Sequence, residues 1–394
     1  MLFSIALILI CGMFLGWICK KLHLPSLLGM IITGIILGPY ALNLIDESII
    51  SISSDLRRIA LIIILMRAGL SLNISDLKKV GRPAILMCFV PACFEMLGMI
   101  LIAPRLLNIS VLDAAIMGAV VAAVSPAVIV PKMLKLIEEG YGTKQSIPQL
   151  ILAGASVDDV FVIVMFTAFT GLAQGNDVSL TGFINIPISI VVGLLFGLIV
   201  GYVFSVYFKK VHIRDTAKVI ILLCTAFVMV TIEDNFSNFI PFSGLIAVMG
   251  LGIALQKKRE VVAIRLSVKF NKLWVCAEIL LFVLVGATVN LKYALSAGFG
   301  VIILIFAVLC FRVIGVLFCL LKTKLNLKER LFCMIAYMPK ATVQAAIGAI
   351  PLSMGLACGD IVLTVAVLSI IITAPLGAFL IDLTYKRLLN KNNE

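Results

Sequence analysis

The chain has 394 residues, of which 62% are hydrophobic and only 13% are charged, and its formal net charge is +12. A soluble domain carries about 25% charged residues, and no compact core hides this much apolar surface from water, so the composition excludes a soluble globular protein. The basic residues lie in short stretches between long apolar runs and form no folded basic surface, which excludes a nucleic-acid-binding role. We therefore expect a polytopic membrane protein.

Thirteen apolar runs of about 20 residues are long enough to cross a bilayer as helices. In chain order they lie near 1–19, 25–44, 56–73, 83–104, 112–134, 147–173, 183–208, 217–233, 240–256, 270–289, 297–321, 329–352 and 359–383. Their connections are short, so we expect an all-α integral membrane protein forming a single transporter unit over 1–394. The first run is followed by Lys20 and Lys21 and preceded by no basic residue, which favours a retained helix over a signal peptide.

The basic residues alternate between the two sides of these runs. Connections that follow odd-numbered runs, with the C-terminal tail, hold 25 Lys and Arg residues, whereas connections that follow even-numbered runs hold only 4. Cytoplasmic loops are the ones enriched in Lys and Arg. The pattern predicts an N-terminus outside and a C-terminus in the cytoplasm, in a bacterial-type inner or plasma membrane.

Seven ionisable side chains fall inside the apolar runs, where a charge at the bilayer centre costs at least about 2.5–3.5 kcal/mol. They are Arg67, Glu95, Asp158, Asp159, Glu278, Arg312 and Lys340. Each is a candidate for function or for pairing with an opposite charge. We expect a positioning role for Arg67, and a structural role at the membrane interface is as plausible as a functional one for Glu278.

Two groups of three runs resemble each other in layout. In the first group, 83–173, Pro126 interrupts the middle run, and in the second, 297–383, Pro339 does the same. The groups are seven runs apart, an odd number, so they cross the membrane in opposite directions, as in the inverted repeats of many secondary transporters. A proline frees a helical carbonyl, which is tolerated at membrane depth only beside protein or a water-filled cavity. We therefore interpret the two breaks as part of an ion path and not as ordinary kinks.

The adjacent carboxylates Asp158 and Asp159 point about 100° apart on a helix. One can face an ion cavity while the other faces a basic partner, and Arg312 and Lys340 are the basic residues deep in the second group. A carboxylate in such a site can hold a proton or a small hard cation, but hardly both. That competition is sufficient for exchange of a cation against protons.

Five stretches of the chain resemble the monovalent cation/proton antiporter superfamily, and its NHA-type sodium/proton antiporter branch in particular. They are "MRAGLSLN", "VSPAVIVP", "GASVDD", "LLFVLVGA" and "MPKATVQAA". The resemblance covers essentially the whole chain, in order. It implies the NhaA/NapA-like antiporter fold, with a core domain from 83–173 and 297–383 in which the two broken helices cross. It also implies a dimerisation or scaffold domain from 1–73 and 183–289, a homodimer, and a core that moves like an elevator.

The resemblance also assigns roles to individual residues. Asp159 is similar to the essential ion- and proton-binding aspartate and Asp158 to its neighbour, with Na+ or Li+ expected at this pair. The expected charge partners are Lys340, Arg312 and Glu95, and the expected additional cation ligands are Val124, Ser125 and Ser156. Thr288 stands where some relatives have an acid, so we group it with Arg67 as a positioning residue. No cofactor is expected besides the transported Na+ or Li+ and H+.

Other classes of protein fit the sequence less well. An intramembrane aspartyl protease has its aspartates on different helices with a GxGD motif, and the first glycine is missing before Asp360. A potassium-efflux subunit with a nucleotide-binding tail would need more than the roughly ten residues that follow the last run. The alternative that stays open is a sodium-coupled organic solute symporter of the same fold. Without a phosphate-binding GxxxxGK[ST] motif, we expect a secondary transporter and not an enzyme.

Overall fold

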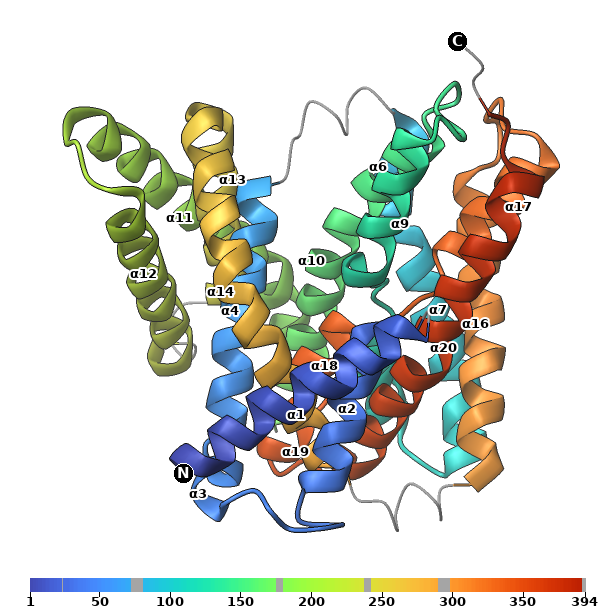
Figure 1. Ribbon diagram of the computed structural model, residues 1–394, viewed down its shortest axis with the longest axis horizontal. Helices are drawn as coiled ribbons and strands as arrows, with labels where there is room; N and C mark the ends of the chain where they lie inside the picture. The colour runs from blue at the N-terminus through green and yellow to red at the C-terminus, as the bar shows by residue number, and fades with distance from the viewer. Residues whose placement is uncertain (23, 72–80, 175–179, 237–241, 290–297, 392–394) are drawn as a thin grey trace. The chain divides into compact units, whose positions relative to one another are not determined.

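The computed structural model describes residues 1–394 except 23, 72–80, 175–179, 237–241, 290–297 and 392–394 (Figure 1). The described residues form helices and connecting segments, with a single isolated β-bridge between Tyr141 and Lys391. The chain divides into two compact units. Unit 1 comprises Met1–Ser54, Asp76–Ala173 and Leu281–Glu394, and unit 2 comprises Asp55–Ser75 and Gln174–Leu280.

Within the described residues, nine helices are long and apolar enough to cross a membrane. They are Leu2–Lys21, Arg82–Leu107, Val111–Glu138, Ile147–Ala173, Val191–Lys210, Asp215–Glu233, Glu260–Ala287, Phe299–Cys319 and Gly359–Leu388. Helices satisfy their own backbone hydrogen bonds, which is what a segment surrounded by lipid requires. The expected all-helical membrane architecture is therefore confirmed, while the number of thirteen spans stays a prediction.

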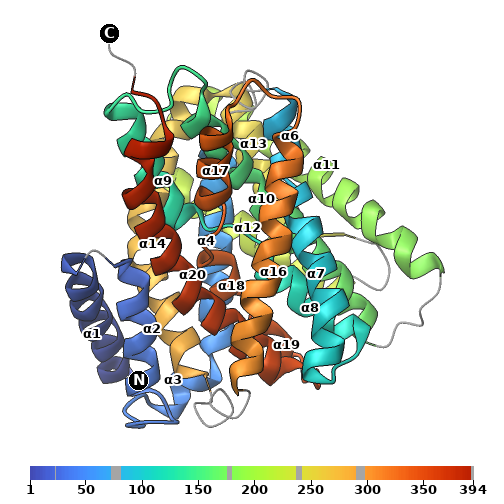
Figure 2. The same cartoon turned by 90° about the vertical axis from the view of Figure 1, so that its right-hand side faces the viewer.

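Unit 1 contains most of the helices. They are α1 (Leu2–Lys21), α2 (Ser26–Leu37), α3 (Glu47–Ser51), α6 (Arg82–Met87), α7 (Val90–Leu107), α8 (Val111–Val121), α9 (Pro126–Glu138), α10 (Ile147–Ala173), α16 (Gly298–Cys319), α17 (Leu327–Ala336), α18 (Thr342–Ile347), α19 (Ile350–Ser353) and α20 (Gly359–Leu388). Within this unit α7 packs along α8 and α16, and α20 packs along α17 and α18 (Figure 2).

Prolines divide three of the expected runs. The run 83–104 forms α6 and α7, with Pro91 in the first turn of α7. The run 112–134 forms α8 and α9, with Pro126 as the first residue of α9. The run 329–352 forms α17, α18 and α19 with Pro339 between the first two. In each case the proline lacks the N–H that would continue the preceding helix. Pro91 and Pro126 lie in the first turn of the next helix, where proline is well suited.

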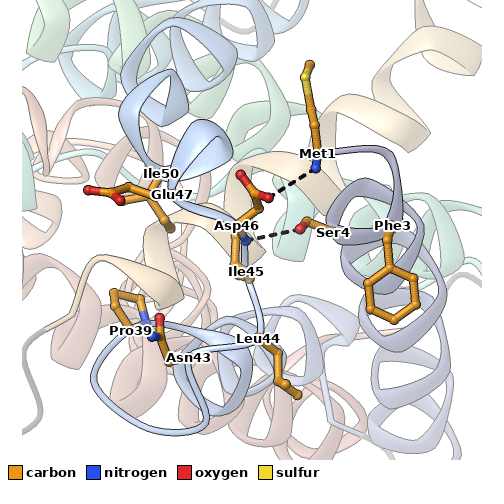
Figure 3. A pocket seen from close by; sticks show the side chains of 10 residues that line it. All are labelled: Met1, Phe3, Ser4, Pro39, Asn43, Leu44, Ile45, Asp46, Glu47 and Ile50. Carbon is orange, nitrogen blue, oxygen red and sulfur yellow. Dashed lines mark hydrogen bonds and ion pairs between the residues drawn. The ribbon is translucent and has the colours of Figure 1, made fainter.

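The loop between α2 and α3 is tied to the start of α1 (Figure 3). The Asp46 carboxylate caps α3 by accepting from the Ser48 backbone N–H at 2.9 Å. It also pairs with the Met1 amine at 3.3 Å, while the Asp46 N–H donates to the Ser4 hydroxyl at 3.0 Å. The hydrogen bonds from Ser48 and the charge of the amine lower the pKa of Asp46 to about 2. This loop borders a cavity of about 730 Å³ that involves only residues 1–50.

Unit 2 is built from the greater part of α4 (Ser53–Ser71), from α11 (Leu180–Lys210), α12 (Asp215–Phe236) and α13 (Gly244–Lys258), and from the first part of α14 (Glu260–Ala287). α11 and α13 lie side by side in both views (Figures 1 and 2). A Cβ on Gly197 of α11 would lie 2.1 Å from the Ala247 carbonyl oxygen of α13, so only glycine permits this approach. The stretch 257–269, between two expected runs, is mostly helical: its first two residues end α13, and 260–269 form the start of α14.

The compact units differ from the predicted domain limits in two places. Met1–Ser54 and 281–289 belong to unit 1 with the expected core, whereas the predicted scaffold domain includes 1–73 and 183–289. The assignment of a moving core and a dimerising scaffold stays a prediction.

Candidate functional site

The site is centred on two non-helical segments of unit 1. The first break lies between α8 and α9 and comprises 122–125, and the second lies between α17 and α18 and comprises 337–341. The Ser125 backbone N–H donates to the Pro339 carbonyl at 2.8 Å, so the two breaks are in direct contact. On its other side Pro339 packs against Gly377 of α20, where a Cβ would lie only 2.4 Å from the Pro339 ring.

Arg312 of α16 joins both breaks to two carboxylates. Its Nε donates to the Tyr337 carbonyl of the second break at 2.7 Å, and Nη1 donates to the Ala122 carbonyl of the first break. The same guanidinium pairs with Glu95 at 2.8 Å and with Asp158 at 3.0 Å. The side chain is fully buried. Planar guanidinium groups suit such multiple fixed hydrogen bonds.

Lys340 lies in the second break and points toward the first. Its Nζ is 2.6 Å from a Glu95 carboxylate oxygen and donates to the Val121 carbonyl at 2.8 Å. Its backbone N–H, freed by the break, donates to the Thr373 hydroxyl of α20 at 3.0 Å. Glu95 of α7 therefore has two cationic partners. They offset the cost of burying its carboxylate, which is only 1% exposed.

Gln344 of α18 is a member of the site that the sequence analysis did not identify. Its Nε2 donates to the carbonyls of Val121 at 3.0 Å and Ala123 at 2.7 Å. The signal was present: Gln344 is a neutral amide five residues after Pro339 in an otherwise small and apolar stretch. With Lys340 and Arg312 it satisfies the carbonyls of 121–123 that the first break leaves without helical partners.

The two neighbouring aspartates of α10 differ. Asp158 Oδ2 accepts from the Val124 backbone N–H at 2.8 Å and from Arg312 at 3.0 Å. Asp159 is 9% exposed, and it has no ion pair or hydrogen bond with any residue that the structure describes. Asp158 thus lies against a basic partner, whereas Asp159 has none among the described residues.

We call Glu95, Asp158, Asp159, Arg312 and Lys340 the charge cluster. It contains three carboxylates and two cationic side chains, all of them buried. Glu95 and Asp158 account for both cations, so Asp159 is the group whose charge has no protein partner within the described residues. A buried carboxylate in that position needs a proton or a bound cation.

Oxygen atoms that lack hydrogen-bond donors surround the same break. The Asp158 Oδ1, Asp159 Oδ1 and Ser125 Oγ atoms are buried without a partner among the described residues. The Val124 carbonyl likewise accepts no hydrogen bond from the described residues. Lys340, Arg312 and Gln344 donate to the carbonyls of 121–123, and backbone N–H groups of α9 donate to the Ser125 carbonyl. Carboxylate, carbonyl and hydroxyl oxygens are the ligands that hard cations prefer. The side chain of Ser156 lies outside the described residues.

The two predicted positioning residues have other partners. Arg67 is part of α4 in unit 2, where the acid that attracts its charge is Glu278 of α14. Thr288 follows α14, and its hydroxyl donates to the Val285 carbonyl at 2.9 Å. In the described part of the chain, no three His, Cys, Asp or Glu residues are grouped as a metal site.

Known proteins share both the sequence pattern and the fold. The family described as "Sodium/hydrogen exchanger, transmembrane" matches residues 5–385. Sodium/hydrogen exchanger 9B2 of Homo sapiens is 33% identical over 425 residues, covering 99% of this chain and 75% of that protein. Sodium/hydrogen exchanger 9B1 of Homo sapiens is 29% identical over 384 residues, covering 94% of this chain and 73% of that protein. The solved structure of the sodium proton antiporter MjNhaP1 from Methanocaldococcus jannaschii has a TM-score of 0.85 at 21% identity and covers 98% of this chain and 97% of that chain.

Proposed function

Because the chain belongs to the sodium/hydrogen exchanger family, we propose that it exchanges Na+ or Li+ for protons across a membrane, with the two kinds of cation competing for the pair Asp158 and Asp159. The observation that carries this proposal is the contrast inside the pair. Asp158 is neutralised by Arg312 at 3.0 Å, whereas Asp159 has no partner among the described residues. The affinity for a cation therefore depends on Asp159 having released its proton.

The transport cycle follows from this competition. Facing the side rich in the metal cation, Asp159 gives up its proton and binds the cation, with Asp158 Oδ1, the Val124 carbonyl and the Ser125 and Ser156 hydroxyls as further ligands. Facing the other side, a proton displaces the cation. Neither form leaves an unpaired charge in the membrane, which favours movement of the loaded site in both directions.

The proposal includes a membrane topology. Thirteen spans with the N-terminus outside and the C-terminus in the cytoplasm make the two broken-helix groups an inverted repeat. A core domain that contains the charge cluster moves against a scaffold domain held in a homodimer, which gives alternating access. We expect this assembly in a bacterial-type plasma membrane.

The energy for transport comes from existing gradients. Because both loaded forms are neutral in this cycle, the concentration gradients of the two cations drive it, and a pH difference of one unit is worth about 1.4 kcal/mol. Such gradients are enough to drive exchange without a cofactor. The relatives that the chain matches are named exchangers, which fits a transporter and not an enzyme.

The test uses everted membrane vesicles with an imposed pH gradient and a pH-sensitive dye. Adding Na+ or Li+ should collapse the gradient in vesicles with the unchanged protein and leave it intact with Asp159→Asn. Asp360→Asn, at the exposed first turn of α20, is the matched control and should transport normally. If none of Na+, Li+, K+ and choline moves protons across a wide pH range although the protein is folded, antiport is wrong. Organic solute symport then becomes the hypothesis to test.

A further inference from the structure

A cavity of about 490 Å³ lies in unit 2, which contains no residue of the charge cluster. It is formed where α11 ends at Lys210, α12 begins at Asp215, and α13 gives way to α14 at Arg259. α11, α12 and α14 contain candidate membrane spans. The shared end of several such helices lies at the membrane–water interface, the depth at which lipid headgroups are found.

The lining of this cavity is strongly basic. Five Lys and Arg side chains and His212 surround a single carboxylate, Asp215. Asp215 already has two partners, Lys218 at 2.9 Å and Arg265 at 3.0 Å. The remaining basic residues of the lining, Lys209, Arg214 and Arg259, pair with no carboxylate in the part of the chain that the structure describes. The cavity therefore holds an excess of positive charge.

Arg259 supplies an independent sign of an anion-binding site. It is the residue at which α13 stops, with φ −142° and ψ 62°, and it contributes to the lining of the cavity. Its Nη1 atom is buried and has no hydrogen-bond acceptor among the described residues. A buried charged N–H group without an acceptor is costly, and buried polar groups are normally paired.

The cavity also has an apolar side. Phe208, Val211, Ile213 and Val262 contribute to its lining. On the adjoining first turns of α14, Val261 is 70% exposed and Ile264 is 56% exposed. Apolar side chains exposed at the end of a membrane helix are suited to acyl chains. A free phosphate ion would use the basic residues of the cavity and none of this apolar surface.

We propose that this cavity binds the phosphate group of an anionic phospholipid, with Arg259 and Lys209 as its principal ligands and the acyl chains against the start of α14. Arginine forms paired hydrogen bonds to phosphate oxygens, and basic pockets between membrane helices suit anionic headgroups. The site depends on unit 2 alone and is independent of the ion exchange proposed for unit 1.

The first experiment uses the unchanged full-length protein, stripped of lipid in detergent. Phosphatidylglycerol, phosphatidylcholine, glycerol 3-phosphate and inorganic phosphate are each titrated, with bound lipid counted by native mass spectrometry and stability followed by thermal unfolding. Phosphatidylglycerol should be retained and raise the melting temperature by about 2 °C or more, and the other three should not. Equal retention of phosphatidylcholine would overturn the proposal. An equal effect of inorganic phosphate or glycerol 3-phosphate would replace the lipid by a soluble anion.

Adjacent residues in the sequence provide a matched pair of variants. Lys209→Gln with Arg259→Gln removes two charges from the lining, whereas Lys210→Gln with Lys258→Gln removes two charges just outside it. The first double variant should bind phosphatidylglycerol about thirtyfold more weakly, and the second should bind it almost normally. Equal losses in both would show general attraction to the membrane surface and overturn the assigned site. Arg259→Lys, which keeps the charge and loses the paired hydrogen bonds, should lie between the two.

Discussion

The two broken segments of unit 1 differ in the side chains that they and their neighbouring helices provide. The first break offers acceptors: the carbonyls of Val121, Ala122 and Ala123 all receive hydrogen bonds from side chains. The second break and the helices around it offer the donors, Lys340, Gln344 and Arg312. A carbonyl that the break frees in one half thus accepts a hydrogen bond from a side chain of the other half.

This difference explains why one half carries the acids and the other the bases. Glu95, Asp158 and Asp159 precede residue 174, and Arg312 and Lys340 follow residue 297. Neither half could leave its buried charges unpaired in a membrane. The surplus is a single carboxylate, Asp159, and it is here that we propose the exchangeable cation binds.

The largest effect should come from removing the donor common to both breaks. Arg312→Met leaves Glu95 with one cationic partner and Asp158 with none, so we expect a loss of about 3–5 kcal/mol of unfolding free energy. Thermal or denaturant unfolding in detergent measures it. Arg312→Lys keeps the charge and should lose less, while Lys328→Met on the exposed face of α17 is the control. A stable Arg312→Met protein would mean that the two halves do not depend on this residue.

The aspartate pair should separate stability from transport. Asp158→Asn weakens a charged hydrogen bond to Arg312 and one to the first break, and should cost about 1.5–3 kcal/mol. Asp159→Asn removes no protein contact in the described structure, so its melting temperature should stay equal or rise while exchange is lost. Equal destabilisation by both substitutions would contradict the division of roles.

A smaller loss of stability is expected at Gln344, the uncharged donor to the first break. Gln344→Leu leaves the Ala123 carbonyl without a donor and weakens that of Val121, which should cost about 1–3 kcal/mol. Gln256→Leu is the matched control, since Gln256 is also buried but lies in α13 of unit 2. Comparable losses at both glutamines would show that burial, and not the link between the breaks, sets the effect.

The smallest effect should come from the ion pair between Asp46 and the Met1 amine, which lies outside both breaks. The pKa of Asp46 is lowered to about 2, so its ionised form stabilises the folded chain above its ordinary pKa near 4. That contribution is lost as the pH falls from about 4 toward 2. The melting temperatures of the unchanged protein and Asp46→Asn should differ slightly at pH 6 and converge at pH 2.5. A constant difference would show that the capping charge is unimportant.

Charge and proline made much of the site predictable from the sequence. Glu95, Arg312 and Lys340 stood out because a buried charge is rare in an apolar run, and Pro126 and Pro339 located both breaks. Gln344 and the carbonyls of 121–123 did not stand out, because they are neither charged side chains nor prolines, the two features that mark the rest of the site. The pairing of Arg312 with Asp158 and Glu95 could not be chosen over other pairings, since spacing along the chain does not fix which helices touch.

The hydrogen bond between Gln344 and Ala123 also has a consequence for biosynthesis. The two residues are 221 positions apart, so the ribosome completes the first break long before its partner exists. Until α18 docks, the carbonyls of 121–123 have no donor from the second half, and at membrane depth such groups require water or other protein. Contacts this distant in sequence form slowly. The first break therefore reaches its final set of hydrogen bonds only when the last helices arrive.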